Sequence, residues 1–188
     1  VLVFDGAMSQ PVVTVNGKEA GKWAYGYNAF RIDITPFIQF GKKNLIEVHL
    51  NNVEESSRWY PGGGLYRPVS VELYGNENFS TWDTFVRTLK ADKQEAEVEV
   101  NALLEGKTGK SGKTVIALLD EAGKKVAEQT VSGATPAVKT TLKVANPLLW
   151  SPESPYLYQV KLTRYEGKKV ADIQTLKTGI RTVAVSKD

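Results

Sequence analysis

The sequence predicts an all-β protein built from two β-sandwich domains. Three observations support this prediction. Apolar and polar residues alternate with period two along much of the chain, turn dipeptides separate the alternating stretches, and no helical period extends beyond about one turn. The chain has 188 residues, of which 41% are hydrophobic, so it can form one large or two small packed domains.

The alternating stretches lie at residues 44–52, 68–75 and 95–106. In the third stretch, Glu95, Glu97 and Glu99 alternate with alanine and valine. Successive side chains of a strand point to opposite faces, so each stretch predicts a strand with one buried and one solvated face. The residues expected on the buried faces are Ile46, Val48, Leu50, Val69, Val71, Leu73, Ala96, Val98, Val100 and Ala102.

Hairpin turns are predicted at three places. Asn16-Gly17 follows a β-rich run and is the strongest short hairpin signal, because both residue types tolerate the positive φ of a two-residue turn. Ala122-Gly123 and Glu166-Gly167 indicate two further hairpins. The stretch "ITPFIQFG" at residues 34–41 is expected to hold one short helical turn and no more.

The polar cluster at residues 75–78 indicates a domain boundary, and we assign residues 1–77 and 78–188 to separate domains. The second part holds about seven strand-like runs in roughly 110 residues, which is typical of an immunoglobulin-like sandwich. The first part holds about five runs, too few to complete two opposing layers. We therefore expect the first domain to lack strands on its N-terminal side and the chain to come from a longer protein.

Composition argues against several kinds of site. The chain has no cysteine, which excludes disulfides, thiolate metal sites and cysteine nucleophiles. Its formal net charge is +3, from 24 basic and 21 acidic residues, and its lysines are scattered along the chain, so no nucleic-acid partner is expected. No apolar run is long enough for a transmembrane helix, so no membrane partner is expected. We also expect no cofactor and no metal ion.

Three weaker signals for chemistry are set aside. Gly112-Lys113-Thr114 ends like a phosphate-binding loop, but Lys107 stands where the first glycine is required and a strand-like run follows. His49 is the only histidine and lies on the polar side of a strand pattern, so no catalytic relay is expected. Glu54 and Glu55 are neighbours in an extended loop, where their carboxyl groups point apart.

The stretch "SSRWYPGGGLYRP" at residues 56–68 carries the strongest functional signal. Trp59 and Tyr60 offer flat apolar faces to a sugar ring, and Arg58 donates hydrogen bonds in a fixed geometry. The alternative is structural, with Trp59 closing the end of a sandwich and Arg58 or Arg67 donating to backbone carbonyls. The residues alone leave both readings open.

The first half of the chain resembles the sugar-binding domain of glycoside hydrolase family 2, the group of β-galactosidases, β-glucuronidases and β-mannosidases. The motifs that carry the resemblance are Asn16-Gly17-Lys18, Gly26-Tyr27 with Phe30, Asp33-Ile34-Thr35, Gly41 with Asn44, Arg58-Trp59 and Gly64-Leu65-Tyr66-Arg67. The stretches 146–160 and 172–183 resemble the end of the family's immunoglobulin-like second domain. There Trp150 and Tyr156-Leu157-Tyr158 are expected to pack, and Gly179-Ile180-Arg181 to lead onward.

The resemblance implies a partial galactose-binding-like jelly roll over residues 1–77, followed by an immunoglobulin-like sandwich over residues 78–188. It places both catalytic glutamates on a TIM barrel outside this chain. No catalytic residue is therefore assigned, and the chain alone is expected to be inactive. The parent enzyme is expected to be a retaining glycosidase, nearest the bacterial β-galactosidases, in which these domains brace the barrel and help to shape the substrate pocket.

Four residues are the candidate sugar contacts implied by the resemblance: Asn52, Arg58, Trp59 and Tyr60. The expected partners are a β-galactoside-like carbohydrate, the catalytic barrel and a second copy of the chain, because an incomplete sandwich exposes strand edges. A periplasmic or secreted location is favoured for the parent. Two alternatives stay open: an independent carbohydrate-binding module, and a structural or adhesive pair of β-sandwiches.

Overall fold

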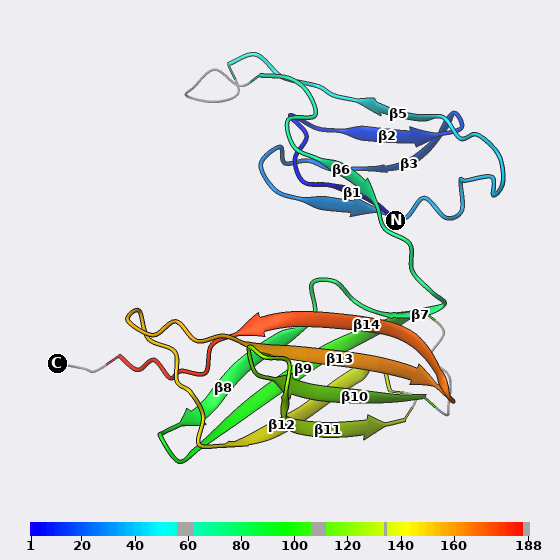
Figure 1. Ribbon diagram of the computed structural model, residues 1–188. Coiled ribbons are helices and arrows are strands. Elements are labelled where there is room, and N and C mark those ends of the chain that lie inside the picture. The colour runs from blue at the N-terminus through cyan, green and yellow to red at the C-terminus, as the bar shows by residue number, and fades with distance from the viewer. Residues whose placement is uncertain (56–61, 107–111, 134, 186–188) are drawn as a thin grey trace. The chain divides into compact units, whose positions relative to one another are not determined.

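A computed structural model describes residues 1–55, 62–106, 112–133 and 135–185. Within these ranges the chain forms fourteen β-strands and no helix, which confirms the predicted all-β class. The strands belong to two compact units, Val1–Leu73 and Tyr74–Asp188 (Figure 1). The division between the units lies before Tyr74, whereas the polar cluster suggested a boundary after residue 77.

The first unit is a small sandwich of two three-stranded antiparallel sheets, in the orders β4-β1-β6 and β3-β2-β5. Its strands are β1 (Leu2–Phe4), β2 (Val12–Val15), β3 (Lys18–Lys22), β4 (Phe30–Ile32), β5 (Ile46–His49) and β6 (Val69–Val71). Phe4 and Phe30 from one sheet meet Val13 and Val15 from the other in a buried core. Burial of this shared apolar face holds the two layers together.

The hairpin and the short helical turn predicted for the first unit are both present. Asn16 and Gly17 connect β2 to β3 with φ values of 53° and 77°, as a tight two-residue hairpin requires. The side chain of Asn16 also donates to the carbonyl of Phe37 at 2.9 Å and anchors the turn. The amides of Phe37 and Ile38 both donate to the carbonyl of Ile34, which makes the single helical turn expected in this stretch.

The prediction that the apolar residues of the stretch 68–75 are buried is wrong. Val69, Val71 and Leu73 are 40%, 57% and 91% exposed. Val69 and Val71 lie directly opposite Phe4 and Leu2, and so they share the inner face of their sheet. β6 is an edge strand that the facing sheet leaves uncovered, whereas the opposite edge strand, β4, carries the buried Phe30 and Ile32. Ile46 is likewise 38% exposed at the start of the edge strand β5. Self-association through such an edge stays a prediction.

The second unit is a larger sandwich with longer strands (Figure 1). One sheet has the order β11-β10-β13-β14, and the other has the order β12-β9-β7 with β8 also paired to β9. The strands are β7 (Glu77–Phe79), β8 (Phe85–Ala91), β9 (Glu95–Gly106), β10 (Gly112–Leu119), β11 (Lys125–Ser132), β12 (Ala137–Ala145), β13 (Tyr158–Glu166) and β14 (Lys169–Thr178).

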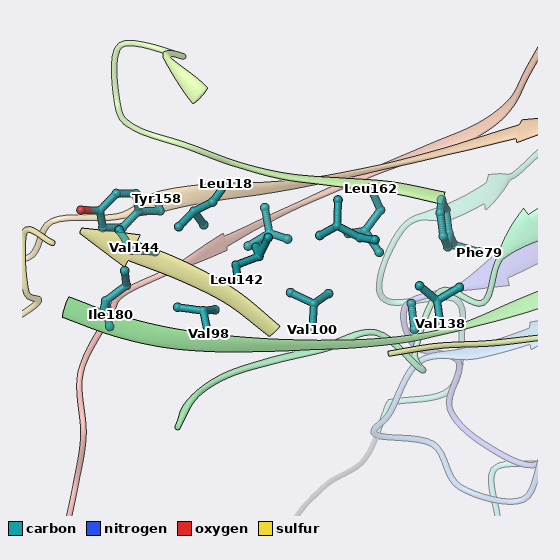
Figure 2. Packing of buried hydrophobic residues seen from close by; sticks show 14 of the residues in the cluster. Phe79, Val98, Val100, Leu118, Val138, Leu142, Val144, Tyr158, Leu162 and Ile180 are labelled. Atoms are coloured by element: carbon teal, nitrogen blue, oxygen red, sulfur yellow. The ribbon is translucent and has the colours of Figure 1, made fainter. Parts of the chain in front are cut away.

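The alternating apolar residues of β9 form part of the core of the second unit. Val98 and Val100 point toward Leu118 and Leu162 of the facing sheet, as Figure 2 shows. Val98 and Val100 are fully buried, as the pattern predicts. Hairpins connect β10 to β11 and β13 to β14 near the two predicted glycine turns. The positive φ of Gly123 and Gly167 explains the need for glycine there.

An ion pair is buried near one end of this core. Arg164 on β13 and Glu77 on β7 are 1% and 3% exposed, with 2.9 Å between Nη2 and Oε1. Arg164 also donates to the hydroxyl of Thr114 and the carbonyl of Gly133. A Cβ at Gly112 would lie 2.0 Å from Nη2 of Arg164, so glycine is required at that position to make room for the guanidinium. The pair joins strands of the two facing sheets.

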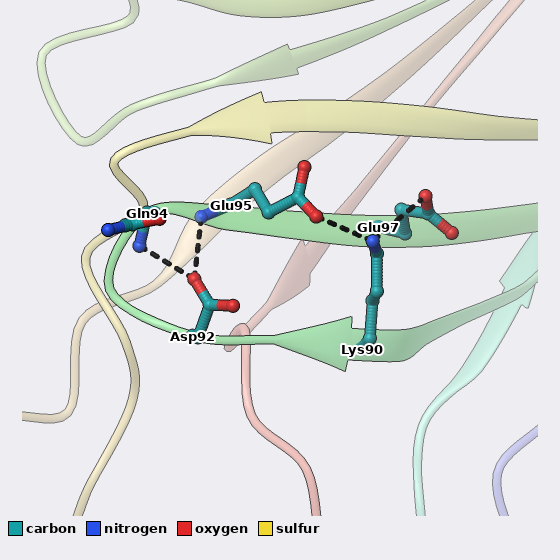
Figure 3. Close-up of polar contacts among 5 residues, drawn as sticks. All are labelled: Lys90, Asp92, Gln94, Glu95 and Glu97. Atoms are coloured by element: carbon teal, nitrogen blue, oxygen red, sulfur yellow. Dashed lines mark hydrogen bonds and ion pairs between the residues drawn. The ribbon is translucent and has the colours of Figure 1, made fainter.

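The tight turn between β8 and β9 is fixed by Asp92 (Figure 3). Its Oδ1 accepts hydrogen bonds from the backbone amides of Gln94 and Glu95 at 2.7 and 2.9 Å. The amide of Glu95, followed by that of Gln94, lowers the pKa of the Asp92 carboxyl. Lys90 pairs with Glu95 at 2.5 Å across the same turn, with Glu97 further along β9. These charges lie on the solvated side of the strands, as the alternation predicts.

We expect Arg164→Met to lower the free energy of unfolding of the second unit by about 3–5 kcal/mol, because Glu77 would be left buried without its cation. The double variant Glu77→Leu/Arg164→Met should recover most of this loss. Urea unfolding followed by circular dichroism measures both, with the exposed neighbour Lys161→Met as a control. A single variant as stable as the wild type would show that the pair contributes nothing.

We expect Glu99 to make the fold acid-sensitive. Hydrogen bonds from Asn101, then Lys139 and Arg87, outweigh burial and lower the pKa of Glu99 from 4.5 to about 2. The stabilisation is therefore complete above pH 4.5 and is lost as the pH falls toward 2. When the pH is lowered from 4.5 to 2, the melting temperature measured by scanning calorimetry should fall less for Glu99→Gln than for the wild type. Parallel curves for the two proteins would contradict this expectation.

Candidate functional site

Four segments of the first unit converge at one end, at residues 8–11, 23–28, 49–52 and 63–66, which we call the loop end. Met8 and Gly64 exchange backbone hydrogen bonds of 2.9 and 3.0 Å. The hydroxyl of Ser9 donates to the carbonyl of Asn51 at 2.7 Å, and the amide of Asn51 donates back to the carbonyl of Ser9. Segments that are distant in sequence are therefore tied together by backbone contacts.

Two glycines allow close packing in and beside the loop end. A Cβ at Gly26 would lie 2.6 Å from Sδ of Met8, and a Cβ at Gly6 would lie 2.6 Å from the ring of Tyr66. The hydroxyl of Tyr66 donates to the carbonyl of Gly26 at 2.7 Å. Tyr66 therefore crosses the backbone at Gly6 and fastens the segment 23–28. Tyr66 therefore has a structural role, while the alternative roles given to Trp59 and to Arg58 or Arg67 stay predictions.

A column of three parallel aromatic rings leads from the core to the loop end. The rings of Phe4 and Phe30 stack with centroids 4.6 Å apart, and the ring of Trp23 stacks on Phe30 at 5.7 Å. The interplanar angle is 7° in both pairs. Nε1 of Trp23 donates to Oδ1 of Asn28 at 2.9 Å, which fixes the rotation of the indole. Trp23 is thereby held rigid while 38% of it stays exposed.

Trp23 lines a groove of about 710 Å³ on the first unit. The lining residues are Gln10, Val12, Lys22, Trp23, Ala24, Tyr25, His49 and Asn51. Lys22 and His49 flank Val12 directly in the sheet β3-β2-β5. The neighbouring Val13 is fully buried, so Val12 and its two partners face outward. The groove therefore lies on the outer face of this sheet and extends to the loop end.

The predicted sugar contacts are only partly within the described residues. Asn52 lies at the loop end, and its Cβ is 3.4 Å from the position of a Cβ at Gly63. Arg58, Trp59 and Tyr60 lie outside the described residues. Sequence reasoning gave Trp23 and Tyr25 no role. The signal that could have found them is the "KWAYGY" stretch, in which three aromatic residues occupy alternate positions of one loop.

The weaker signals form no site. Gly112-Lys113-Thr114 begins strand β10, so no helix N-terminus follows it. Glu54 and Glu55 lie in an exposed turn. Within the parts of the chain that the structure describes, no three histidine or acidic side chains gather as a metal site would require. The same residues contain no helix with the length and apolarity needed to span a bilayer.

The buried acids of the described ranges serve structural roles. Glu77 is paired with Arg164, and Glu99 is paired with Arg87 and Lys139 at 2.8 and 3.1 Å. A retaining glycosidase needs two carboxyl groups about 5–5.5 Å apart, one to protonate the leaving oxygen and one to attack the sugar. Glu77 and Glu99 are only 3% and 5% exposed, so neither carboxyl group is open to a sugar, and these two acids are not candidates for glycoside chemistry.

Comparison with solved structures defines the class of the protein. A glycosyl hydrolase family 2 member from Bacteroides cellulosilyticus DSM 14838 superposes with a TM-score of 0.88 at 36% identity, over 97% of this chain and 26% of that chain. The two β-sandwich units are therefore of the kind found in these carbohydrate-cleaving enzymes. The family model for glycosyl hydrolases family 2 matches residues 79–181, more than half of the chain. The chain belongs to glycosyl hydrolase family 2.

Two curated relatives match along nearly the whole chain. A Formosa agariphila protein, whose name marks it provisionally as a beta-glucuronidase, is 38% identical over 96% of this chain and 17% of its own length. The beta-galactosidase BoGH2A of Bacteroides ovatus is 33% identical over 97% of this chain and 22% of its own length. The chain spans about a fifth of the length of these relatives.

We expect Gly6→Ala to destabilise the first unit by about 1–3 kcal/mol, because the new methyl group overlaps the ring of Tyr66 and displaces its hydrogen bond to Gly26. Urea unfolding compares it with Gly62→Ala, where a Cβ would meet nothing within 4 Å. Equal stability of the two variants would show that Tyr66 does not fasten the loop end.

Proposed function

We propose that this chain forms the non-catalytic β-sandwich part of a family 2 enzyme that hydrolyses terminal β-galactosides with retention of configuration. The observation that supports this most strongly is coverage: matches extend over 96–97% of this chain but only 17–22% of the relatives. The buried acids of the described ranges, which serve structural ion pairs, support the same assignment. The acid and the nucleophile would then belong to a barrel that works with these units.

In this proposal the two units have different tasks. The first unit is a partial jelly roll whose loop end forms part of the substrate pocket wall, with Asn52 and the segment of Arg58, Trp59 and Tyr60 nearest the sugar. The backbone contacts of Met8 with Gly64 and of Ser9 with Asn51 support this role, because they hold the chain on either side of that segment. The second unit is an immunoglobulin-like brace for the barrel, for which its large core and its buried ion pair are suited.

The substrate assignment separates two groups of relatives within the family. The names of the relatives include both beta-galactosidase and beta-glucuronidase. These substrates differ at C6, where the galactoside carries a hydroxymethyl group and the glucuronide a carboxylate, and at the configuration of the 4-hydroxyl. Assays should therefore compare an aryl β-galactoside with the matching aryl β-glucuronide, and we expect the galactoside to be the better substrate.

We expect the 188-residue chain to show no turnover of an aryl β-galactoside, whereas a longer chain that includes a family 2 barrel is active. In the active enzyme, Trp59→Ala should lower kcat/KM about tenfold, a loss near 1.4 kcal/mol of transition-state binding. Trp82→Ala, an exposed tryptophan of the second unit, is the matched control and should leave kcat/KM unchanged. Turnover by the 188-residue chain would overturn the proposal.

A further inference from the structure

The exposed face of Trp23 has the properties of a sugar-binding platform. One face of the indole is covered by Phe30 at 5.7 Å, while the residue remains 38% exposed and lines the groove. The backbone amide of Trp23 donates to the carbonyl of Pro11, and its Nε1 donates to Asn28. Because the ring is already held in place, binding would cost little side-chain freedom. The apolar C–H face of a pyranose suits such a surface.

Polar groups for recognition surround the platform. Nδ2 of Asn51 donates to Oε1 of Gln10 at 3.0 Å, so these two amides hold each other in position. Oδ1 of Asn51 and Nε2 of Gln10 have no hydrogen-bond partner in the described part of the chain. His49 and the partly exposed Tyr25 add an imidazole and a hydroxyl to the lining. Apolar walls with a few oriented polar groups are typical of small-ligand sites, and about 710 Å³ is an ordinary size for one.

The charge of the groove favours an acidic ligand at one end. Lys22 is the only charged side chain among the lining residues that the structure describes, and no described residue forms an ion pair with it. Two residues further along β2, Thr14 is flanked by Glu19 and Glu47. The outer face therefore changes from basic beside Val12 to acidic beside Thr14. An anionic group would be attracted to the end at Lys22 and repelled from the other.

We propose that this groove is an ancillary binding site for a uronic-acid-containing glycan, with one pyranose stacked on Trp23 and its carboxylate at Lys22. This inference goes beyond the proposed pocket wall, because the site is complete within the first unit and needs no barrel. It also differs from the predicted contacts at Arg58, Trp59 and Tyr60. The site would hold the enzyme on an acidic polysaccharide while the reaction takes place elsewhere.

The test measures binding of two matched oligosaccharides to the 188-residue chain by isothermal titration calorimetry. One probe is cellotetraose, and the other is the β-(1→4)-linked tetramer of glucuronic acid, which differs only in a carboxylate at each C6. We expect the acidic tetramer to bind about tenfold more tightly at low salt, a preference of about 1.4 kcal/mol. The preference should shrink as salt screens Lys22.

Single variants distinguish the contribution of the Trp23 ring to binding from that of the Lys22 charge. We expect Trp23→Ala to weaken both tetramers at least about tenfold, near 1.4 kcal/mol. Lys22→Gln should remove the preference for the acidic tetramer and leave cellotetraose binding unchanged. Trp82→Ala should change neither affinity. Trp23→Phe keeps a ring on Phe30 and should bind both tetramers at reduced affinity. It replaces Trp23→Ala if that variant does not fold by circular dichroism.

Several results would overturn the proposal. Failure of both tetramers to bind the wild-type chain would exclude a glycan site here. Unchanged affinity in Trp23→Ala would place any binding elsewhere, and equal affinity for the two tetramers would remove the role of Lys22. Binding of an oligothymidylate in place of both sugars would assign the groove to nucleic acid. The inactivity expected of the 188-residue chain on aryl glycosides is measured separately, so the two proposals can fail independently.

Discussion

Phe4, Phe30 and Trp23 lie parallel in one column that connects the core of the first unit to its surface. Phe4 and Phe30 belong to the sheet β4-β1-β6, whereas Trp23 directly follows β3 of the facing sheet. The column therefore joins the two layers of a small sandwich and holds an exposed indole in one orientation. A six-stranded unit has a small core, and in the proposed site the same rings would serve both packing and recognition.

In the second unit, buried acidic side chains are paired with basic ones. Arg164 and Glu77 neutralise each other inside the core, and Glu99 on the central strand β9 is held between Arg87 and Lys139. In these arrangements each carboxylate is held by a basic side chain, whereas a catalytic acid must give up and regain a proton. The ion pairs, together with the long strands, suit a rigid spacer. Sugar recognition would then be confined to the first unit and glycoside cleavage to a separate barrel.

The sequence predicted those features that depend on neighbouring residues. The hairpin at Asn16-Gly17 and the buried face of Val98 and Val100 follow from local backbone preference and alternation. Val69 and Val71 were misread because alternation identifies a face, while burial depends on whether the opposite sheet extends over it. Trp23 was missed for a similar reason. The orientation of its ring depends on Phe30, a residue of the other sheet. Contacts between two sheets produce no periodic pattern in the sequence, so alternation could not reveal this one.

The claim that a core-anchored indole presents a sugar-binding face can be tested most directly by nuclear magnetic resonance of the tryptophan side chains. The chain is titrated with the glucuronic acid tetramer, and the indole N–H resonances are followed. The account predicts that the resonance of Trp23 shifts progressively, together with the ring protons of Phe30 beneath it, while those of Trp82 and Trp150 do not move. A titration that leaves Trp23 unchanged while another indole shifts would contradict it.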